Sequence, residues 1–234
     1  MLEKTRAIVL HNLKYRETGI ILYCYSENYG RITFIANGVR KNKTRFPASY
    51  FQPLTLIEVI FYNKQSRNLY RMKEISSSLI YNTMHVNIIK SCIAMFIAEV
   101  LYRTLHEEES NASLFGFLEK SFCDLDSRDE GIANFHLHFM LHFSGFLGIF
   151  PAGLLTGRRK DADNKDIISF DELDERAFEA VLKMLKDSGC DLQEIRINNK
   201  ERNEILDCII KHYNFHLEGV LKLKSLPVLR EVLN

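Results

Sequence analysis

The clearest chemical feature of the sequence is a short run of basic residues between two segments that we expect to be strands. Four cations fall within six positions. A loop of this composition can neutralise several phosphates and release their counterions, so the run favours binding to a nucleic acid. The four cations are Arg40, Lys41, Lys43 and Arg45.

Aromatic residues are frequent around this run. Seven of the ten tyrosines lie in residues 1–80, and Phe46 follows the run directly. Cations that follow a phosphate backbone, interleaved with rings on which bases stack, are typical of proteins that bind single strands. The competing interpretation is a solvated basic loop beside an aromatic core. Other candidate nucleic-acid ligands in this part of the chain are Lys14, Arg16 and Arg31.

Charge is divided unevenly along the chain, although the net charge of the 234 residues is only +1. Residues 1–80 carry 13 Lys and Arg against 5 Asp and Glu, a net charge of +8. The remaining residues carry 18 basic and 25 acidic side chains, a net charge of −7. A basic first third before an acidic remainder indicates a polyanion-binding module attached to a second domain.

Patterns typical of enzymes and metal sites do not occur in the sequence. His138 and His142 share a helix face and His136 lies on another, but no further ligand accompanies them, so we expect no zinc site. The acidic segment 161–172 lacks the turn glycine of a calcium loop. No phosphate loop, dinucleotide fingerprint or nucleophile elbow is present. We therefore expect a binding protein with no catalytic residue, metal or cofactor.

Cysteine usage and hydropathy favour a protein of the cytoplasm. The five cysteines are widely spaced and form no CxxC pair, which favours reduced thiols over disulfides. The N-terminus lacks the apolar stretch of a secretory signal. Residues 133–157 contain no charged side chain, but three histidines and Pro151 favour a buried helix over a membrane span.

The first 80 residues form short segments rich in β-branched and aromatic side chains, the composition of strands. Alternation is clearest where Ile32, Phe34 and Ala36 fall on one face. Five short strands in a basic module of this size predict a small closed barrel of the OB-fold type. The expected strands are Arg6–His11, Gly19–Tyr25, Arg31–Asn37, Leu54–Tyr62 and Leu69–Ser76.

From about residue 83 the hydrophobic pattern takes the period of a helix. Ser127 begins a capping-box pattern that should open the charge-free helix, and Asn199 should cap a later one. The expected helices cover 89–101, Ala112–Cys123, 127–147, Glu172–Lys186 and 199–217, before a short leucine-rich C-terminal segment.

These patterns together predict an α+β protein with two domains. An OB-fold domain should occupy residues 1–80, and a mostly helical domain should occupy residues 81–234. An irregular loop is expected within the helical domain at about 148–170, where Pro151 ends the charge-free helix.

Ordered motifs along most of the chain resemble those of one protein family. An opening strand, a strand that ends in a Gly-basic run and a Gln-Pro entry to the fourth strand follow one another at the N-terminus. Farther along come a helix that breaks at a proline, Phe143–Pro151, and a Lys-Ser segment, Lys222–Leu226. This ordered set resembles the RecO family of bacterial recombination mediators. The N-terminal residues that carry the resemblance are Ala7–Leu10, Tyr15–Thr18, Gly30, Ala36–Lys41, Phe46 and Phe51–Leu54.

The resemblance implies a role in DNA repair and recombination. Members of the family bind single- and double-stranded DNA, anneal complementary strands and contact the acidic tail of the single-stranded DNA-binding protein. With RecR, and often with RecF, they help to load RecA onto coated gaps. The resemblance therefore implies these partners, and a protein associated with the bacterial nucleoid rather than with a membrane.

Two details of the resemblance concern particular residues. Many members hold zinc with two cysteine pairs after the proline break, but residues 152–170 contain no Cys, so the metal is not carried over. A receptor for an acidic, apolar tail needs a cation beside an apolar pocket. Arg103 is one candidate, and Lys222 and Lys224 among the C-terminal leucines are another, unless those leucines simply pack into the core.

Three alternatives remain open from the sequence. An OB-fold module could serve RNA in translation or RNA processing, which competition between DNA and RNA of one sequence would detect. A nuclease would need two facing carboxylates beside the basic loop. A protein-binding scaffold would lack DNA affinity that depends on salt.

Overall fold

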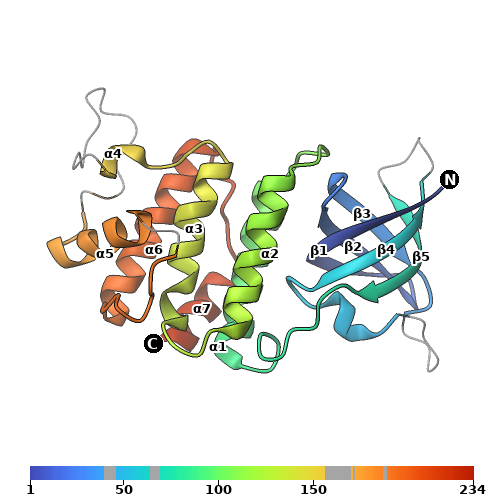
Figure 1. Cartoon of the computed structure of the whole chain (residues 1–234), viewed down its shortest axis with the longest axis horizontal. Helices are drawn as coiled ribbons and strands as arrows, with labels where there is room; N and C mark the ends of the chain where they lie inside the picture. Colours follow the sequence, from blue (N-terminus) through green and yellow to red (C-terminus); the bar gives the residue numbers. More distant parts are fainter. Residues whose placement is uncertain (40–45, 64–68, 156–169, 171, 187–188) are drawn as a thin grey trace. The chain divides into compact units, whose positions relative to one another are not determined.

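The computed structural model describes most of the chain as two compact units, Met1–Ser127 and Arg128–Asn234 (Figure 1). The first unit contains the strands and helices α1 (Ile88–Thr104) and α2 (Ala112–Ser127). The domain boundary expected near residue 80 stays a prediction. The described residues are 1–39, 46–63, 69–155, 170, 172–186 and 189–234.

The five strands close into a barrel in the order β1-β2-β3-β5-β4. Paired strands are antiparallel except β3 and β5, which run parallel and pair only at Phe34–Tyr70 and Ile35–Arg71. This is the OB-fold barrel expected from the sequence. The elements are β1 (Leu2–Tyr15), β2 (Gly19–Ser26), β3 (Gly30–Ala36), the 3-10 helix η1 (Ala48–Phe51), β4 (Leu56–Tyr62) and β5 (Tyr70–Ser77).

Alternate side chains of the strands fill the barrel. Along β3, Ile32, Phe34 and Ala36 are buried, which confirms the alternation read from the sequence. β1 is longer than expected because its first half pairs with β4 and its second half with β2. An irregularity between Val9 and His11 lets the strand bend from one partner to the other. The interior residues are Ala7, Val9, Leu22, Cys24, Ile32, Phe34, Ala36, Val39, Phe46, Phe51, Ile57, Val59, Phe61 and Met72.

The chain leaves the barrel through a segment held by the carboxylate of Asp126. That carboxylate accepts hydrogen bonds from the backbone N–H groups of Asn82, Thr83 and Met84 at 2.7–2.9 Å. The buried Lys90 of α1 donates to the carbonyl oxygen of Asp126 at 2.7 Å. Burial raises the pKa of Asp126, but the N–H donors outweigh burial and hold that pKa below its usual value. The connection from β5 to α1 is therefore fixed against the end of α2.

The described part of the second unit is built from helices. At the start of α6, Asn198 accepts from the N–H of Glu201 at 3.0 Å, and Glu201 accepts from the N–H of Asn198 at 2.7 Å. The cap is thus one residue before the predicted Asn199. The hydroxyl of Tyr213 on α6 donates to the carbonyl of Met140 on α3 at 2.6 Å. The helices are α3 (Phe135–Phe146), α4 (Ala152–Leu155), α5 (Glu175–Lys186), α6 (Asn199–His216) and α7 (Leu226–Leu233).

The prediction that Ser127 opens the charge-free helix is wrong. Ser127 is the last residue of α2, and its hydroxyl donates to the carbonyl of Asp124. A turn through Gly131 and the short 3-10 helix η2 (Ile132–Asn134) precede α3. The helix α4 lies within the segment expected to be irregular. Among the described residues, no helix has both the length and the apolar character to cross a membrane.

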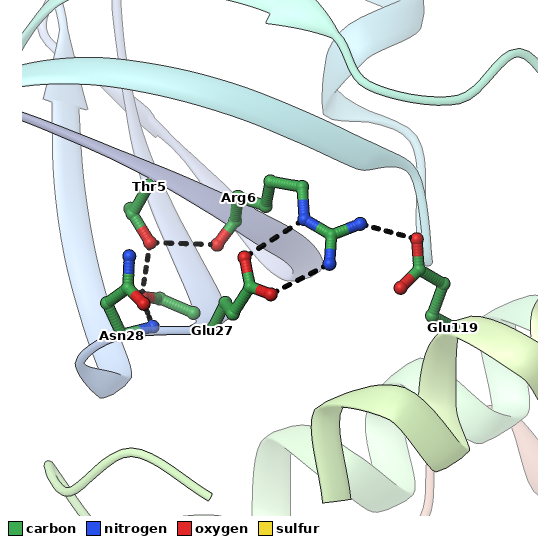
Figure 2. A network of polar contacts seen from close by, with 6 residues as sticks. Thr5, Arg6, Glu27, Asn28 and Glu119 are labelled. Carbon is green, nitrogen blue, oxygen red and sulfur yellow. Dashed lines mark hydrogen bonds and ion pairs between the residues drawn. The ribbon is translucent and has the colours of Figure 1, made fainter. Parts of the chain in front are cut away.

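Arg6 joins the barrel to α2 through a three-donor contact (Figure 2). Its guanidinium donates to both carboxylate oxygens of Glu27, at 2.9 and 2.8 Å, and to Glu119 at 2.6 Å. The guanidinium also lies 5.2 Å from the centroid of the Phe115 ring. The hydrogen bond with Glu27 raises the pKa of Arg6 and lowers the pKa of Glu27. Such a planar, bidentate contact fixes orientation as well as charge.

We predict that Arg6→Lys, which keeps the charge but loses the fork, lowers the free energy of unfolding by about 1 kcal/mol at pH 7, since the pair is partly exposed. The pKa of Glu27 is lower in the folded chain than in the unfolded one. The stabilisation is therefore present above the unfolded pKa, about 4.3, and is lost as pH falls through the folded pKa.

The measurement is thermal unfolding of wild type and Arg6→Lys between pH 7 and pH 3. A difference of about 1 kcal/mol corresponds to about 2–4 °C in Tm for a chain of this size, and the two melting temperatures should converge at the acid end. Lys4→Ala is the control, because Lys4 pairs with Glu58 while 59% exposed. A gap that persists unchanged at the acid end would contradict the assignment to Glu27.

Candidate nucleic-acid interface

An exposed basic turn joins β1 to β2. Lys14 and Arg16 are both exposed, and the Arg16 guanidinium lies 5.1 Å from the centroid of the Tyr15 ring. The turn is tight, because a Cβ built on Gly19 would lie 2.7 Å from the carbonyl oxygen of Tyr15. The two cations are therefore presented from a constrained position on the barrel.

The basic run begins and ends beside this turn and strand. Val39, just before the run, donates its N–H to the carbonyl of Thr18 at 2.9 Å. After the run, the carbonyl of Phe51 accepts from the side-chain amide of Asn12 at 2.9 Å. Both flanks of the run are thus attached close to Lys14 and Arg16. The predicted ligands Arg40, Lys41, Lys43 and Arg45 themselves lie outside the described residues.

Arg31, predicted to contact DNA, is instead held against α1. Its guanidinium lies 4.5 Å from the ring centroid of Tyr102 and 5.4 Å from that of Tyr23. It also donates to the carbonyl of Tyr102 at 3.3 Å. Burial lowers the pKa of Arg31. We leave Arg31 out of the proposed interface because its charged group is engaged within the fold.

Phe46, a predicted DNA-binding residue, packs in the barrel. Its side chain is 7% exposed and belongs to the interior of the barrel. A ring that is buried in the core cannot also offer its face to a base. We therefore leave Phe46 out of the proposed interface, and the sequence pattern missed this because a buried ring and a stacking ring have the same composition.

Arg71 is an exposed cation that the sequence analysis did not single out. It is the second residue of β5, opposite Ile35 of β3 and Tyr62 of β4. The sequence does carry a signal for Arg71, because this residue follows Lys64 and Arg67 closely. Those two cations belong to a second basic connection of the barrel, residues 64–68, which lies outside the described residues. Arg71 therefore adds a positive charge near the start of β5, where the connection joins the barrel again.

The two predicted partner-binding positions differ in how exposed their cations are. Arg103 donates to Glu99, one turn earlier on α1, from Nε at 3.1 Å and from Nη2 at 3.0 Å. Lys222 and Lys224 are exposed, and they follow the buried Leu221 directly in the sequence. The C-terminal lysines are therefore the more accessible of the two sets.

The histidines of α3 serve packing in the described structure. The rings of His138 and His142 are 4.5 Å apart, and Nε2 of His142 lies 2.8 Å from the carbonyl oxygen of Met184. Burial lowers the pKa of His136 to about 3, so that ring is neutral near pH 7. Within the described ranges, no three His, Cys, Asp or Glu side chains are grouped to hold a metal ion. The absence of zinc from the protein stays a prediction.

A basic OB-fold barrel followed by helices defines a nucleic-acid-binding class of protein. Residues 1–80 match the family model described as "Recombination protein O N terminal", and residues 85–154 match "Recombination protein O C terminal". Proteins named "DNA repair protein RecO" from Phocaeicola vulgatus, Christiangramia forsetii and Bacteroides fragilis are 38%, 37% and 35% identical to the chain, over 99% of both lengths. The chain therefore belongs to the RecO family of DNA repair proteins.

We predict that replacing the four cations of the basic run by Ala flattens the salt dependence of single-strand binding. Each phosphate contact contributes roughly −0.7 to the slope of log affinity against log salt, so the slope should fall by up to about 3. Affinity should fall similarly for all base sequences, because phosphate contacts carry no base code. The measurement is fluorescence anisotropy over a salt series.

A charge-matched control replaces four exposed lysines of the second unit by Ala, namely Lys183, Lys186, Lys200 and Lys211. This control should leave the slope unchanged if the interface is on the barrel. Equal slopes for wild type and the basic-run variant would place the DNA elsewhere.

Proposed function

We propose that the chain is a recombination mediator that binds single- and double-stranded DNA through its barrel and anneals complementary strands. It then helps to load RecA onto gaps coated with the single-stranded DNA-binding protein, together with RecR and, in some settings, RecF. It acts in the cytoplasm at the nucleoid. The helical residues after the barrel supply surfaces for these protein partners.

The observation that carries this proposal is the location of positive charge on an OB-fold barrel. The residues of the barrel have a net charge of +8, and its exposed turn with Lys14 and Arg16 adjoins both flanks of the basic run. Membership of a DNA repair family agrees with a polyanion ligand. Because annealing requires only that two phosphate backbones be shielded from each other, this charge suffices and no nucleotide hydrolysis is needed.

The test is strand annealing on complementary DNA coated with single-stranded DNA-binding protein. Wild type and the four-lysine control should accelerate annealing without ATP, and the variant with Ala at all four positions of the basic run should be strongly impaired. The same reaction with RNA of matched sequence addresses the alternative ligand. Failure of wild-type protein to anneal coated DNA, or a clear preference for RNA, would overturn the proposal.

We also propose Lys222 and Lys224 as the receptor for the acidic, apolar tail of the single-stranded DNA-binding protein. Both lysines are exposed, whereas Arg103 is only partly exposed. A carboxylate bound by a cation beside apolar side chains suits such a peptide.

Reversing both charges, Lys222→Glu with Lys224→Glu, should weaken peptide binding by at least about 1.5 kcal/mol, close to tenfold. Arg103→Glu should have a smaller effect, and Lys186→Glu with Lys200→Glu is the matched control. Peptide anisotropy with folded proteins is the measurement. Equal affinity for the Lys222/Lys224 variant and its control would show that the receptor lies elsewhere.

A further inference from the structure

The aromatic residues of the barrel, which suggested base stacking, are almost all engaged within the first unit. Residues 1–80 contain eleven Tyr and Phe, and all eleven are among the described residues. Neither residues 40–45 nor residues 64–68 contain a ring. The positions that belong to the interior or pack against it are Phe34, Phe46, Phe51, Phe61, Tyr29, Tyr50 and Tyr70.

Two further rings lie where β2 and β3 meet the end of α1. Tyr25 is 2% exposed. Tyr23 packs edge-on to Tyr102 of α1, with ring centroids 5.3 Å apart, and Arg31 lies over both rings. The part of the β2–β3 face nearest the β2–β3 turn is thus covered by α1. In OB-folds this face is a usual platform for nucleic acid.

The segment after α1 covers more of the β2–β3 face near the β2–β3 turn. The N–H of Arg31 donates to the carbonyl of Glu107 at 2.8 Å. A Cβ built on Gly30 would lie 2.3 Å from the carbonyl oxygen of Glu109, so the two backbones are in close contact. Glu107, Glu108 and Glu109 are exposed acidic residues at this place. A nucleic acid would meet negative charge here instead of a stacking surface.

The two remaining rings do not make a platform. Tyr15 is partly buried and lies beneath the Arg16 guanidinium. Tyr62, at 41% exposed, is the one Tyr or Phe of residues 1–80 in the exposed class. Stacking of successive bases needs successive exposed rings. The barrel instead exposes cations, namely Lys14 at the end of β1, Arg16 on the β1–β2 turn and Arg71.

We infer that the barrel binds the sugar-phosphate backbone of DNA and leaves the bases unstacked by protein and free to pair. This inference rests on the proposed function and specifies which part of the DNA is the ligand. It explains how one surface serves single and double strands, since both offer phosphates. It also leaves the base edges of a bound single strand available to a complementary strand.

The test compares oligo(dT) with an abasic strand of equal length, which keeps every phosphate and lacks every base. If bases stack on protein, each lost base weakens binding at least about fivefold, equivalent to about 1 kcal/mol. Backbone binding predicts affinities within about twofold and the same salt slope for both strands. Anisotropy with the full chain measures both quantities.

Tyr62→Ala tests the one exposed Tyr or Phe of residues 1–80, and the affinity of this variant for oligo(dT) should match that of wild type. Permanganate reactivity gives a second readout, because thymines in the bound strand should stay as reactive as in the free strand. Tight binding of oligo(dT) with a tenfold or greater loss for the abasic strand would overturn the inference while leaving the proposed function intact. Failure of both strands to bind would overturn both the inference and the proposed function.

Discussion

Closure of a small five-stranded barrel is the constraint on which the rest of the structure depends. Inward positions must be filled by apolar side chains, and here four phenylalanines occupy the interior while tyrosines pack around it. The rings therefore stabilise the fold by burial and edge-to-face contacts, such as Phe34 with Phe61 at 5.2 Å. Charged side chains have no place inside, so Lys and Arg occupy outward strand positions, turns and connections.

This separation of rings from charges connects the fold to the function. A surface that offers charge without stacking is indifferent to base identity and to strandedness, which suits a family of DNA repair proteins. The surface is also limited on one side, because Arg31 and Tyr102 fasten α1 over part of the β2–β3 face. At another place on the barrel, Arg6 forks onto Glu27 and reaches Glu119 of α2. Arg6 and Arg31 thus hold the first unit together, and we propose that the exposed cations bind DNA.

Much of the fold could be predicted from the sequence, because strand alternation and helical periodicity are local. The alternation of Ile32, Phe34 and Ala36 placed β3 correctly, and five strands sufficed to predict the OB-fold. The contacts that the sequence does not indicate are those between distant residues. The stacking of Arg31 on Tyr102 joins positions far apart in the chain, and the burial of Phe46 depends on how the barrel closes. Ser127 is a residue type that favours the start of a helix, but here it is the last residue of α2, since tertiary packing decides where that helix ends.

The central claim is that phosphate charge, read by the barrel, is what this protein recognises in DNA. The most direct measurement is the affinity for a single strand in which alternate phosphates are replaced by neutral methylphosphonates while every base is kept. Neutralising every second phosphate removes about half of the counterion release, so the affinity should fall steeply and its salt dependence should fall by about half. A methylphosphonate strand that binds as tightly as the natural strand would contradict the claim, because recognition would then reside in the bases.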